Sequence, residues 1–557
     1  MQNRLENPWS YLSSDVLQKY ITKEVIDELS YFLPNLRPNE FKENEITKKR
    51  NLAKIFNSFS GADSLEKREF RDLFFSSLPT EKLEKLSSVF GENLFRGNRE
   101  EIIQKLKSLR WIKEEKQIKI CEMLNIDQSL LPEEKYVVPA ELSSFEMLKP
   151  FKQLKDYQFP VVAKAKEKLK NTAARFFIQM PTGSGKTRVA MEVISEFIKN
   201  SNREVKILWL AHQKELCVQS YDCFVEVWSH LKDRELVLYR LWNEGDKVSL
   251  SKNLSKNSLI ISNFQKIYSE LSNDENHYNQ IKKKLDLIII DEAHKAIAPT
   301  YKFVTDTLAS VKTKIIGLTA TPGRSIIDDE SNRSLAIFFH SERVEIAPPN
   351  NERVISYLKQ RKVLSKADHE PIHVDLKIEL SKKQVEYIKE NLELPKSIIS
   401  SLSNNEVRNF EILKKIDNRL KNKPKSKIIF FGLSIKHSKF ICAVLNIMGV
   451  KASHVDGGTS MNRRNSILED FKNGDLQVLC NERLISTGFD APKTDTIVIA
   501  RPTFSIVLYS QIIGRGLRGP TIGGTEHCKI IDVKDNIRGY SDFDSLYEYF
   551  DEYFENR

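Results

Sequence analysis

A run of glycines with a lysine and a threonine is suited to holding phosphate. The segment MPTGSGKT, residues 180–187, follows an apolar run at 176–179 and precedes a helical pattern. Glycines let backbone N–H groups wrap an anion without Cβ clashes, and a helix start adds partial positive charge. Lys186 can reach the β- and γ-phosphates of a nucleoside triphosphate, and the Thr187 hydroxyl can bind Mg²⁺. Met180 stands where the general pattern has its first glycine. The candidate phosphate-binding residues are Pro181, Thr182, Gly183, Ser184, Gly185, Lys186 and Thr187.

Two adjacent carboxylates follow a second apolar run, residues 285–290, and form the sequence DEAH with Asp291 first. Parallel sheets place catalytic groups at the carboxyl ends of their strands. Asp291 can hold Mg²⁺, and Glu292 can polarise the water that attacks the γ-phosphate. Combined with the phosphate-binding segment, these acids predict a protein that binds ATP and Mg²⁺ and hydrolyses ATP.

Over about residues 150–535, these and further motifs resemble, in order, those of the superfamily 2 helicases with a DEAH box. LKDYQ at 154–158 resembles the Q-motif, and GLTATP at 317–322 looks like the motif that couples hydrolysis to movement. The resemblance implies that Tyr157 and Gln158 contact the nucleotide, with Gln158 reading the adenine edge. It also implies coupling roles, which fall on His294, Thr319, Thr321 and Gln511.

The second half of the chain carries the remaining motifs of the family. IFFGLSIKH at 429–437 is similar to motif IV, STGFDAP at 486–492 to motif V, and QIIGRGLR at 511–518 to motif VI. The resemblance makes Arg515 and Arg518 the arginine fingers, because a planar guanidinium suits the charge on the γ-phosphoryl oxygens. It adds Gly488 and Asp490 to the ATP-binding residues.

Short hydroxyl, amide and imidazole side chains in these motifs can bond the phosphate backbone of a nucleic acid without reading its sequence. AHQKEL at 211–216 and SNFQ at 262–265 resemble motifs of the family that touch the nucleic-acid backbone. With motifs IV and V, the resemblance makes His212, Ser262, Gln265, Ser434 and Thr487 the candidates for nucleic-acid binding. Within the superfamily, the motifs are similar to those of RadD-like bacterial repair helicases, of restriction-enzyme motor subunits and of XPB-like proteins. This implies DNA as the partner, in repair, restriction or phage defence. RNA unwinding and an ATP-gated nucleic-acid clamp that recruits an effector are the alternatives.

The elements that must position these residues are two series of short apolar runs that alternate with helical segments, a pattern typical of parallel sheets covered by helices. The predicted fold class is α/β, with two tandem RecA-like parallel-sheet domains behind a mainly α-helical N-terminal domain. The predicted division is a helical accessory domain at 1–145, lobe 1 at 146–345, lobe 2 at 346–540 with a linker at 346–425, and an acidic aromatic helix at 541–557.

Charge supports a polyanionic partner for the two lobes. Of the net charge of +11, residues 1–150 contribute −1, whereas 151–350 and 351–557 contribute +6 each. A basic surface of this kind favours binding to nucleic-acid phosphates. The near-neutral N-terminal region favours an accessory or protein-docking role over a DNA-binding helix pair, and the C-terminal helix is a second candidate for docking a protein.

Composition excludes several other classes of protein. Hydrophobic residues make up 40% of the 557 residues and charged residues 29%, which is ordinary for a globular chain. No apolar run approaches the roughly 20 residues of a membrane-spanning helix, and the N-terminus does not resemble a secretory signal. The six cysteines are scattered without CxxC spacing, which predicts no zinc site or disulfide framework and fits a cytoplasmic protein.

Overall fold

The computed structural model describes most of the chain. It covers residues 7–42, 45–59, 61–90, 99–126, 131, 153–231, 234–242, 256–272, 282–321, 323, 329–349, 352–374, 380–391, 393–483, 491–502 and 505–534. The predicted C-terminal helix at 541–557 lies outside these ranges. No helix in the described part of the chain combines the length and apolarity needed to cross a membrane.

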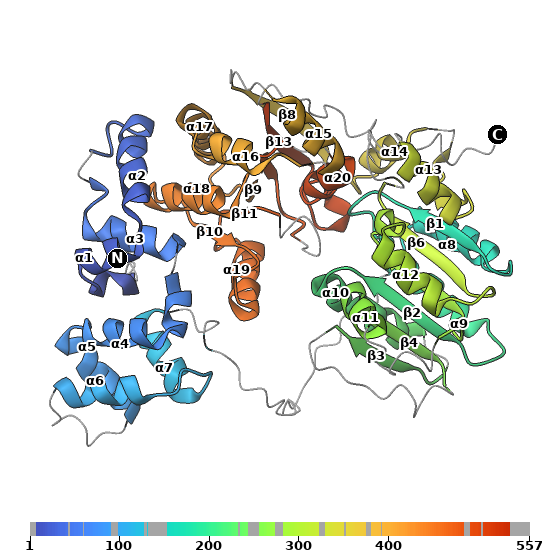
Figure 1. Ribbon diagram of the computed structural model, residues 1–557, viewed down its shortest axis with the longest axis horizontal. Helices are drawn as coiled ribbons and strands as arrows, with labels where there is room; N and C mark the ends of the chain where they lie inside the picture. Colours follow the sequence, from blue (N-terminus) through green and yellow to red (C-terminus); the bar gives the residue numbers. More distant parts are fainter. Residues whose placement is uncertain are drawn as a thin grey trace.

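Lobe 1 is built on a seven-stranded sheet in which all neighbouring strands pair parallel (Figure 1). The strand order is β3-β4-β2-β5-β6-β1-β7. The strands are β1 (Arg175–Gln179), β2 (Lys206–Ala211), β3 (Val237–Leu241), β4 (Ser258–Asn263), β5 (Leu287–Asp291), β6 (Lys314–Thr319) and β7 (Arg343–Glu345). The helices are α8 (Gln158–Lys168), α9 (Lys186–Lys199), α10 (Lys214–Leu231), α11 (Phe264–Ser272), α12 (Pro299–Leu308) and α13 (Asp329–Phe338).

Alternation along the central strand explains why both faces of this sheet are covered. In β5, Leu287 and Ile289 join the apolar cluster formed with α8, α9 and α10. Ile288 and Ile290 join the cluster formed with α11, α12 and α13. Because successive strand residues point to opposite faces, a continuous apolar run requires helices on both sides of the sheet.

Lobe 2 contains a six-stranded sheet, also parallel throughout, in the order β10-β11-β9-β12-β13-β8. Its strands are β8 (Lys366–His373), β9 (Ile428–Phe431), β10 (Ala452–Val455), β11 (Val478–Asn481), β12 (Thr496–Ile499) and β13 (His527–Lys534). Its helices are α14 (Val354–Gln360), α15 (Lys382–Asn391), α16 (Lys396–Ser403), α17 (Glu406–Asn422), α18 (Ile435–Ile447), α19 (Met461–Asn473) and α20 (Ile506–Ile513). Two parallel sheets behind N-terminal helices confirm the predicted fold class.

The segment 346–425, predicted as the linker part of lobe 2, contains β8 and helices α14 to α17, and β8 pairs with β13 over eight residues. The sequence pattern did not indicate β8, because it is an edge strand whose sequence KADHEPIH exposes most of its side chains. Such a strand lacks the apolar run that marked the buried strands.

The described residues of the N-terminal region form seven α-helices and short 3-10 turns, drawn in blue in Figure 1. The α-helices are α1 (Ser14–Tyr20), α2 (Lys23–Leu36), α3 (Lys49–Phe59), α4 (Arg68–Ser76), α5 (Thr80–Ser87), α6 (Arg99–Ser108) and α7 (Glu115–Leu124). An aromatic cluster forms the centre of this region: the Trp9 ring lies 5.2 Å from Phe56, 6.1 Å from Phe70 and 5.4 Å from Phe74, centroid to centroid.

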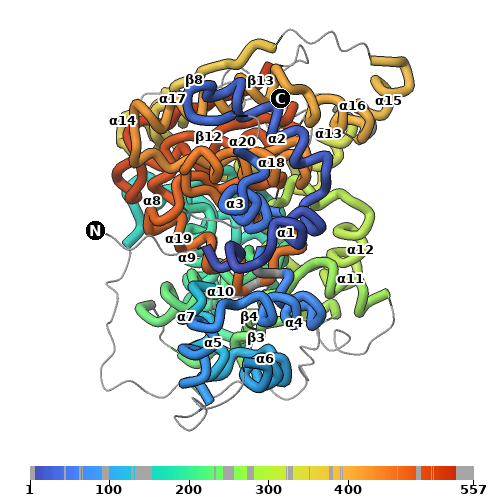
Figure 2. The backbone as a smooth tube through the Cα atoms, turned by 90° about the vertical axis from the view of Figure 1, so that its left-hand side faces the viewer, coloured from blue at the N-terminus to red at the C-terminus, as the bar shows by residue number. Residues whose placement is uncertain are grey.

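The N-terminal helices are docked on lobe 2, not attached loosely to it. The buried Phe32 of α2 lies 6.3 Å from Phe410 of α17 and 5.7 Å from Phe440 of α18. Arg37 forms an ion pair with Asp417 of α17. One apolar cluster runs from the N-terminal helices through α17 and α18 to the lobe 2 sheet. Figure 2 shows α2 and α3 in front of α18, so this region is a structural extension of lobe 2.

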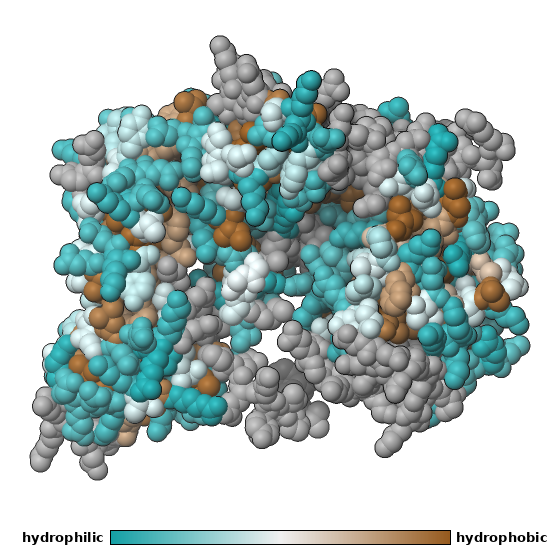
Figure 3. Space-filling model, in the orientation of Figure 1, coloured by the Kyte–Doolittle hydropathy of each residue, from teal (hydrophilic) through white to brown (hydrophobic). Residues whose placement is uncertain are grey.

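The opposite side of the N-terminal helices is separated from lobe 1. In Figure 3 a hollow lies between the described N-terminal helices and lobe 1. The N-terminal helices therefore contact one lobe extensively and stand apart from the other.

Removing the Phe32 side chain is expected to weaken this docking. We predict that Phe32→Ala lowers the free energy of unfolding by about 3 kcal/mol, since a buried phenyl ring leaves a cavity. Tyr31→Ala is the matched control, because Tyr31 is the neighbouring residue and is 56% exposed. Urea unfolding followed by far-UV circular dichroism measures both. Equal midpoints for the two variants would contradict the docked arrangement.

Candidate nucleotide site

The segment 180–187 leads from β1 into α9 at the carboxyl ends of the strands of the lobe 1 sheet. Gly183 and Gly185 have φ values of +87° and +89°, a left-handed region that other residues rarely adopt. Gly185 is the N-cap of α9, so the first N–H groups of this helix open toward the loop. The Lys186 ammonium donates to the Met180 carbonyl at 3.2 Å, which folds its side chain back over the loop. The geometry is that of an anion cradle.

Tyr157 and Gln158 brace this loop from behind. The Tyr157 hydroxyl donates to the Ser184 carbonyl at 3.0 Å, and Gln158 Nε2 donates to the same oxygen at 2.9 Å. Gln158 Oε1 accepts from the Lys155 backbone N–H at 2.8 Å. Both ends of the Gln158 amide therefore bond to protein here, and its predicted reading of adenine stays a prediction.

The two acids lie at the carboxyl end of β5, beside the loop. Asp291 is buried, and Glu292 has φ 52° and ψ 50°, a left-handed conformation that is strained for this residue type. Strain of this kind is typical of functional sites. The Glu292 N–H donates to Asp291 Oδ1 at 3.0 Å, and His294 Nδ1 lies 3.4 Å from Glu292 Oε2. Burial, together with the neighbouring Glu292 charge, raises the pKa of Asp291 to about 7.

Lobe 2 completes the site with two arginines that follow α20. Glycine geometry shows how closely the lobes meet: a Cβ on Gly514 would lie 2.5 Å from the Thr182 Cβ, and one on Gly183 would lie 3.5 Å from Arg518 Cγ. Burial lowers the pKa of Arg515 to about 10, opposed by the charge of Glu292, and burial lowers that of Arg518 to about 10.

Electrostatics link the residues of the two lobes. Burial lowers the pKa of the Lys186 ammonium; the Glu292 and Asp291 charges oppose this, while Arg515 and Arg518 add to it. Three cations and two carboxylates from two lobes thus share one partly buried space. Such a cluster is suited to a polyanion with a bound cation, because the ligand would neutralise the excess positive charge.

The coupling candidates of lobe 1 are tied to the phosphate loop by backbone bonds. The Met180 N–H donates to the Thr319 carbonyl at 3.1 Å, at the end of β6. The Thr319 hydroxyl donates to the Thr321 carbonyl at 2.6 Å, and both threonines are buried. In lobe 2, Gln511 is buried in α20, one turn before Arg515.

The residues present fit a magnesium–nucleotide complex. Thr187 lies at the start of α9, and the buried carboxylate of Asp291 faces the same cluster of charges. Among the described residues, no group of three or more His, Cys, Asp or Glu side chains is placed to hold a metal. Mg²⁺ is commonly held by one or two protein oxygens with phosphate oxygens and water, so Thr187 and Asp291 are sufficient candidates.

The candidates for nucleic-acid binding differ in how exposed their side chains are. Gln265 is exposed on α11, whereas Ser434 is the N-cap of α18 and accepts from the His437 N–H. Burial lowers the pKa of His212 to about 3, so its imidazole is neutral at physiological pH. The Ser262 hydroxyl is fully buried and donates to the Leu241 carbonyl at 2.7 Å, so it is not presented to a strand in this arrangement. Thr487, Gly488 and Asp490 lie outside the described residues.

Two further contacts between the lobes were not found by sequence reasoning. Arg361 of lobe 2 lies 2.5 Å from Asp156, next to the loop brace. Arg464 of α19 pairs with Glu215 of α10 elsewhere on the interface between the lobes. Asp156 lies within a quoted motif, and Glu215 lies close to the candidate His212. The arginine partners of both acids are more than 200 residues away in the chain, so no local pattern indicates these pairs.

Two parallel-sheet lobes with a shared anion site between them define a two-domain nucleotide-binding protein. Residues 151–324 match the family described as the res subunit of type III restriction enzymes, and residues 409–519 match the helicase conserved C-terminal domain. The chain belongs to the superfamily 2 helicases.

Curated relatives share the helicase part of the chain. The putative ATP-dependent helicase IRC3 of Saccharomyces cerevisiae is 27% identical over 68% of this chain and 51% of its own length. A 51.5 kDa protein of a Lactococcus phage is 27% identical over 65% of this chain and 66% of its own. The chain thus spans about half to two thirds of these relatives. The solved type ISP restriction-modification enzyme LlaBIII, bound to DNA, is 18% identical, covers 73% of this chain and 29% of its own, and has a TM-score of 0.49.

A methyl group on Gly185 is expected to block the nucleotide site. In Gly185→Ala the new Cβ would lie 2.4 Å from Gln158 Nε2, at a φ of +89°. We predict that this variant loses ATP binding, measured with a fluorescent ATP analogue, and at least 90% of ATP turnover. Gly449→Ala is the control, because Gly449 has a φ of +85° but open space around it. Equal activity of the two variants would show that the loop tolerates the substitution.

In the nucleotide-free protein, ionisation of Asp291 is expected to lower the free energy of unfolding as the pH rises. Because burial raises the folded-state pKa to about 7 from 3.8, its stabilising proton is held at low pH and lost as the pH rises through 7. We predict that Asp291→Asn raises Tm relative to the unsubstituted protein at pH 8 more than at pH 5. Asp306→Asn, on the exposed side of α12, is the control. A Tm difference that is constant from pH 5 to pH 8 would contradict the raised pKa.

Proposed function

We propose that this protein is an ATP-driven motor that moves along or unwinds DNA. The observation that carries the proposal is the meeting of Arg515 and Arg518 of lobe 2 with Lys186, Asp291 and Glu292 of lobe 1. A site divided between two lobes is complete only when they meet, so ATP turnover reports their closure. This links the chemistry of the site to relative motion of the lobes.

Each residue of the site has a distinct task in hydrolysis. Lys186 and the N–H groups of the loop bind the phosphates, and Glu292 orients the attacking water and accepts its proton. Bound Mg²⁺ would neutralise part of the phosphate charge, held by Thr187 and Asp291. Arg515 and Arg518 stabilise the charge that develops on the γ-phosphoryl oxygens. When the phosphates leave, the repulsion among the three cations favours opening of the lobes.

The choice of DNA is supported by the wording of the motifs and by the net charge of +6 on each lobe region. It is also supported by the match of lobe 1 to a restriction-enzyme subunit family. We place the protein in the cytoplasm, in repair, restriction or phage defence. The six cysteines, all free thiols, are compatible with a reducing compartment. Relatives also include proteins named as RNA helicases, which keeps RNA as the second candidate substrate.

An ATPase assay with three nucleic acids tests the function. We predict that single-stranded or double-stranded DNA raises kcat by at least tenfold and that RNA of equal length does so less. Stimulation by RNA alone would replace DNA by RNA. Equal turnover with all three nucleic acids and without any would contradict a motor and favour the ATP-gated clamp.

Arg515→Ala separates catalysis from binding. We predict that it retains ATP binding but loses roughly a thousandfold in kcat, as expected for loss of an arginine finger. Arg203→Ala is the matched control, because the Arg203 side chain is 71% exposed and pairs with Asp286, which is not one of the site residues. Normal turnover by Arg515→Ala would assign the finger role to another residue.

A further inference from the structure

A five-residue turn, residues 361–365, connects α14 to β8 at the start of lobe 2. It follows a helix that lies at the junction of the lobes, because Ile355 and Leu358 of α14 belong to one apolar cluster with residues of both lobes. The turn contacts lobe 1 on one side and the rest of lobe 2 on the other. Each of these contacts reaches a segment that carries residues of the nucleotide site.

On the lobe 1 side, the turn is paired with Asp156. Arg361 Nη1 lies 2.5 Å from Asp156 Oδ2, and the Arg361 guanidinium lies 4.8 Å from the centre of the Tyr357 ring, one helical turn earlier in the chain. The other carboxylate oxygen of Asp156 accepts from the Tyr157 N–H at 2.8 Å. The Tyr157 hydroxyl in turn donates to the Ser184 carbonyl of the phosphate loop. The ion pair therefore joins lobe 2 to the residues that brace the phosphate loop.

On the lobe 2 side, the turn supports the backbone of Arg518. The Ser365 hydroxyl is fully buried and lies 2.7 Å from the Arg518 carbonyl. The N–H of Gly519, the next residue, donates to the Val363 carbonyl at 2.9 Å. A Cβ on Gly519 would clash with backbone atoms of the turn, so the two segments pack backbone against backbone. The position of the turn therefore determines where the Arg518 side chain starts.

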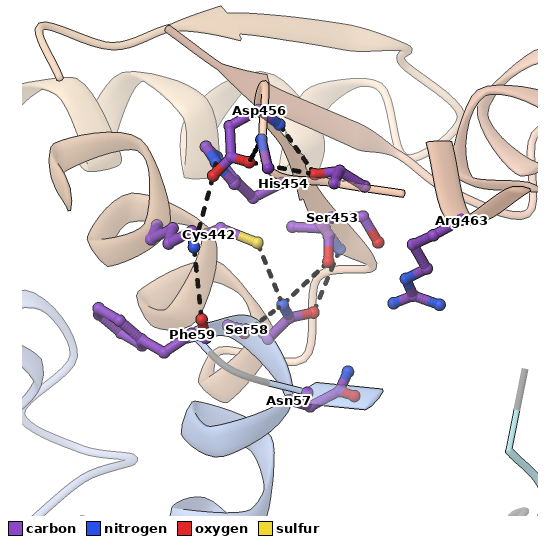
Figure 4. A pocket seen from close by; sticks show the side chains of 14 residues that line it. Asn57, Ser58, Phe59, Cys442, Ser453, His454, Asp456 and Arg463 are labelled. Carbon is purple, nitrogen blue, oxygen red and sulfur yellow. Dashed lines mark hydrogen bonds and ion pairs between the residues drawn. The ribbon is translucent and has the colours of Figure 1, made fainter. Parts of the chain in front are cut away.

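Other polar contacts of lobe 2 hold it to the N-terminal helices, around the pocket shown in Figure 4. Asn446 Nδ2 of α18 donates to the Ser58 hydroxyl at 3.1 Å. The Lys439 ammonium donates to the Phe59 carbonyl at 3.4 Å. These bonds add to the apolar core that lobe 2 shares with the N-terminal helices. Contacts that guide closure are instead those between lobe 2 and lobe 1, and the pair of Arg361 with Asp156 is one of them.

The exposure of this ion pair indicates which property it affects. The Arg361 side chain is 39% exposed and that of Asp156 is 63% exposed. Exposed pairs stabilise a folded protein little, because water screens them. A weak pair forms and breaks readily, which suits a contact that is made in each closure of the lobes. By contrast, a catalytic group that is displaced by about 1 Å can lose roughly a hundredfold in rate. Alignment of the site, not global stability, is the property that such a pair can control.

We propose that Arg361 is a positioning residue for ATP hydrolysis: its pair with Asp156 aligns the 361–365 turn, and with it Arg518, against the phosphate loop. Arg361 acts through the backbone of the turn and not on the phosphates. The proposal rests on the proposed function, because it assigns the contact that sets the geometry of the closed site during ATP turnover.

Arg361→Gln is the central test, because it removes the charge and keeps most of the side-chain length. Steady-state ATPase kinetics of the full chain with Mg²⁺, without nucleic acid and with single-stranded DNA, give kcat. We expect kcat to fall about fivefold, since Arg518 is then less well aligned in the closed site. The Kd of a fluorescent ATP analogue should change less than about twofold, because the phosphate loop is unaltered. A merely structural role would not separate kcat from Kd in this way.

Lys362→Gln is the matched control. Lys362 is the neighbouring residue, its side chain is 61% exposed, and it pairs with Glu526 of the same lobe at 3.4 Å. The substitution makes the same change of charge without touching a pair between the lobes. We expect its kcat to stay within about 1.5-fold of that of the unsubstituted protein, as for most exposed substitutions.

Variants of Asp156 test the pair from the other side. Asp156→Asn keeps the oxygen that accepts from the Tyr157 N–H but removes the charge, so it should lower kcat as Arg361→Gln does. Arg361→Asp places two carboxylates opposite each other and should lower kcat about tenfold or more. The double variant Asp156→Arg/Arg361→Asp restores opposite charges and should recover part of that loss. A Tm within a few degrees of the unsubstituted protein shows that each variant is folded.

The outcomes separate this inference from the proposed function. If the unsubstituted protein hydrolyses no ATP, both fail. If it hydrolyses ATP but no nucleic acid stimulates it, the motor fails, and the basal kcat values still decide the role of Arg361. If Arg361→Gln and Lys362→Gln have equal kcat, only the positioning role is overturned. An equal loss in Arg361→Asp and in the double variant would also overturn it, as would a raised Kd at an unchanged kcat.

Discussion

The arrangement depends on one electrostatic constraint: positive side chains from two lobes converge on a space that excludes much of the water. Lys186, Arg515 and Arg518 outnumber the carboxylates of Asp291 and Glu292, and burial makes the charges of Lys186, Arg515, Arg518 and Asp291 costly. An anion between the lobes relieves this cost, and its loss restores it. In the proposed function, closure and anion binding are therefore one equilibrium, and the backbone around the site keeps the charges in place.

Backbone conformation provides that placement. The phosphate loop uses two left-handed glycines, whereas Glu292 adopts the same region with a side chain that disfavours it. The phosphate loop follows β1 and Glu292 follows β5, so both lie at the carboxyl ends of strands in one parallel sheet. Tyr157 and Gln158 fill the space behind the loop. A well-packed support of this kind holds strained residues that a flexible loop would relax.

Local patterns in the sequence predicted the fold class and the residues that the structure brings together at the nucleotide site. Lys186 begins α9, Asp291 ends β5 and Arg515 follows α20, and the type of each of these elements is readable from its own residues. What could not be predicted are pairings between distant segments: Arg37 with Asp417, Arg464 with Glu215, and Phe32 with Phe440. These pairings depend on how the folded surfaces fit together, and the spacing of residues within one element does not indicate that fit. The strand β8 was missed for the related reason that an exposed edge strand needs few apolar residues.

The attachment of the N-terminal helices to lobe 2 has a mechanical consequence. Their shared apolar core packs the two into one unit, while α4 to α7 extend far from the nucleotide site (Figures 1 and 2). A rigid arm converts a small rotation near its pivot into a larger displacement at its tip. In the proposed motor, a few degrees of lobe closure would thus be amplified into a larger displacement of α4 to α7 relative to lobe 1, which would lengthen the stroke at the expense of force.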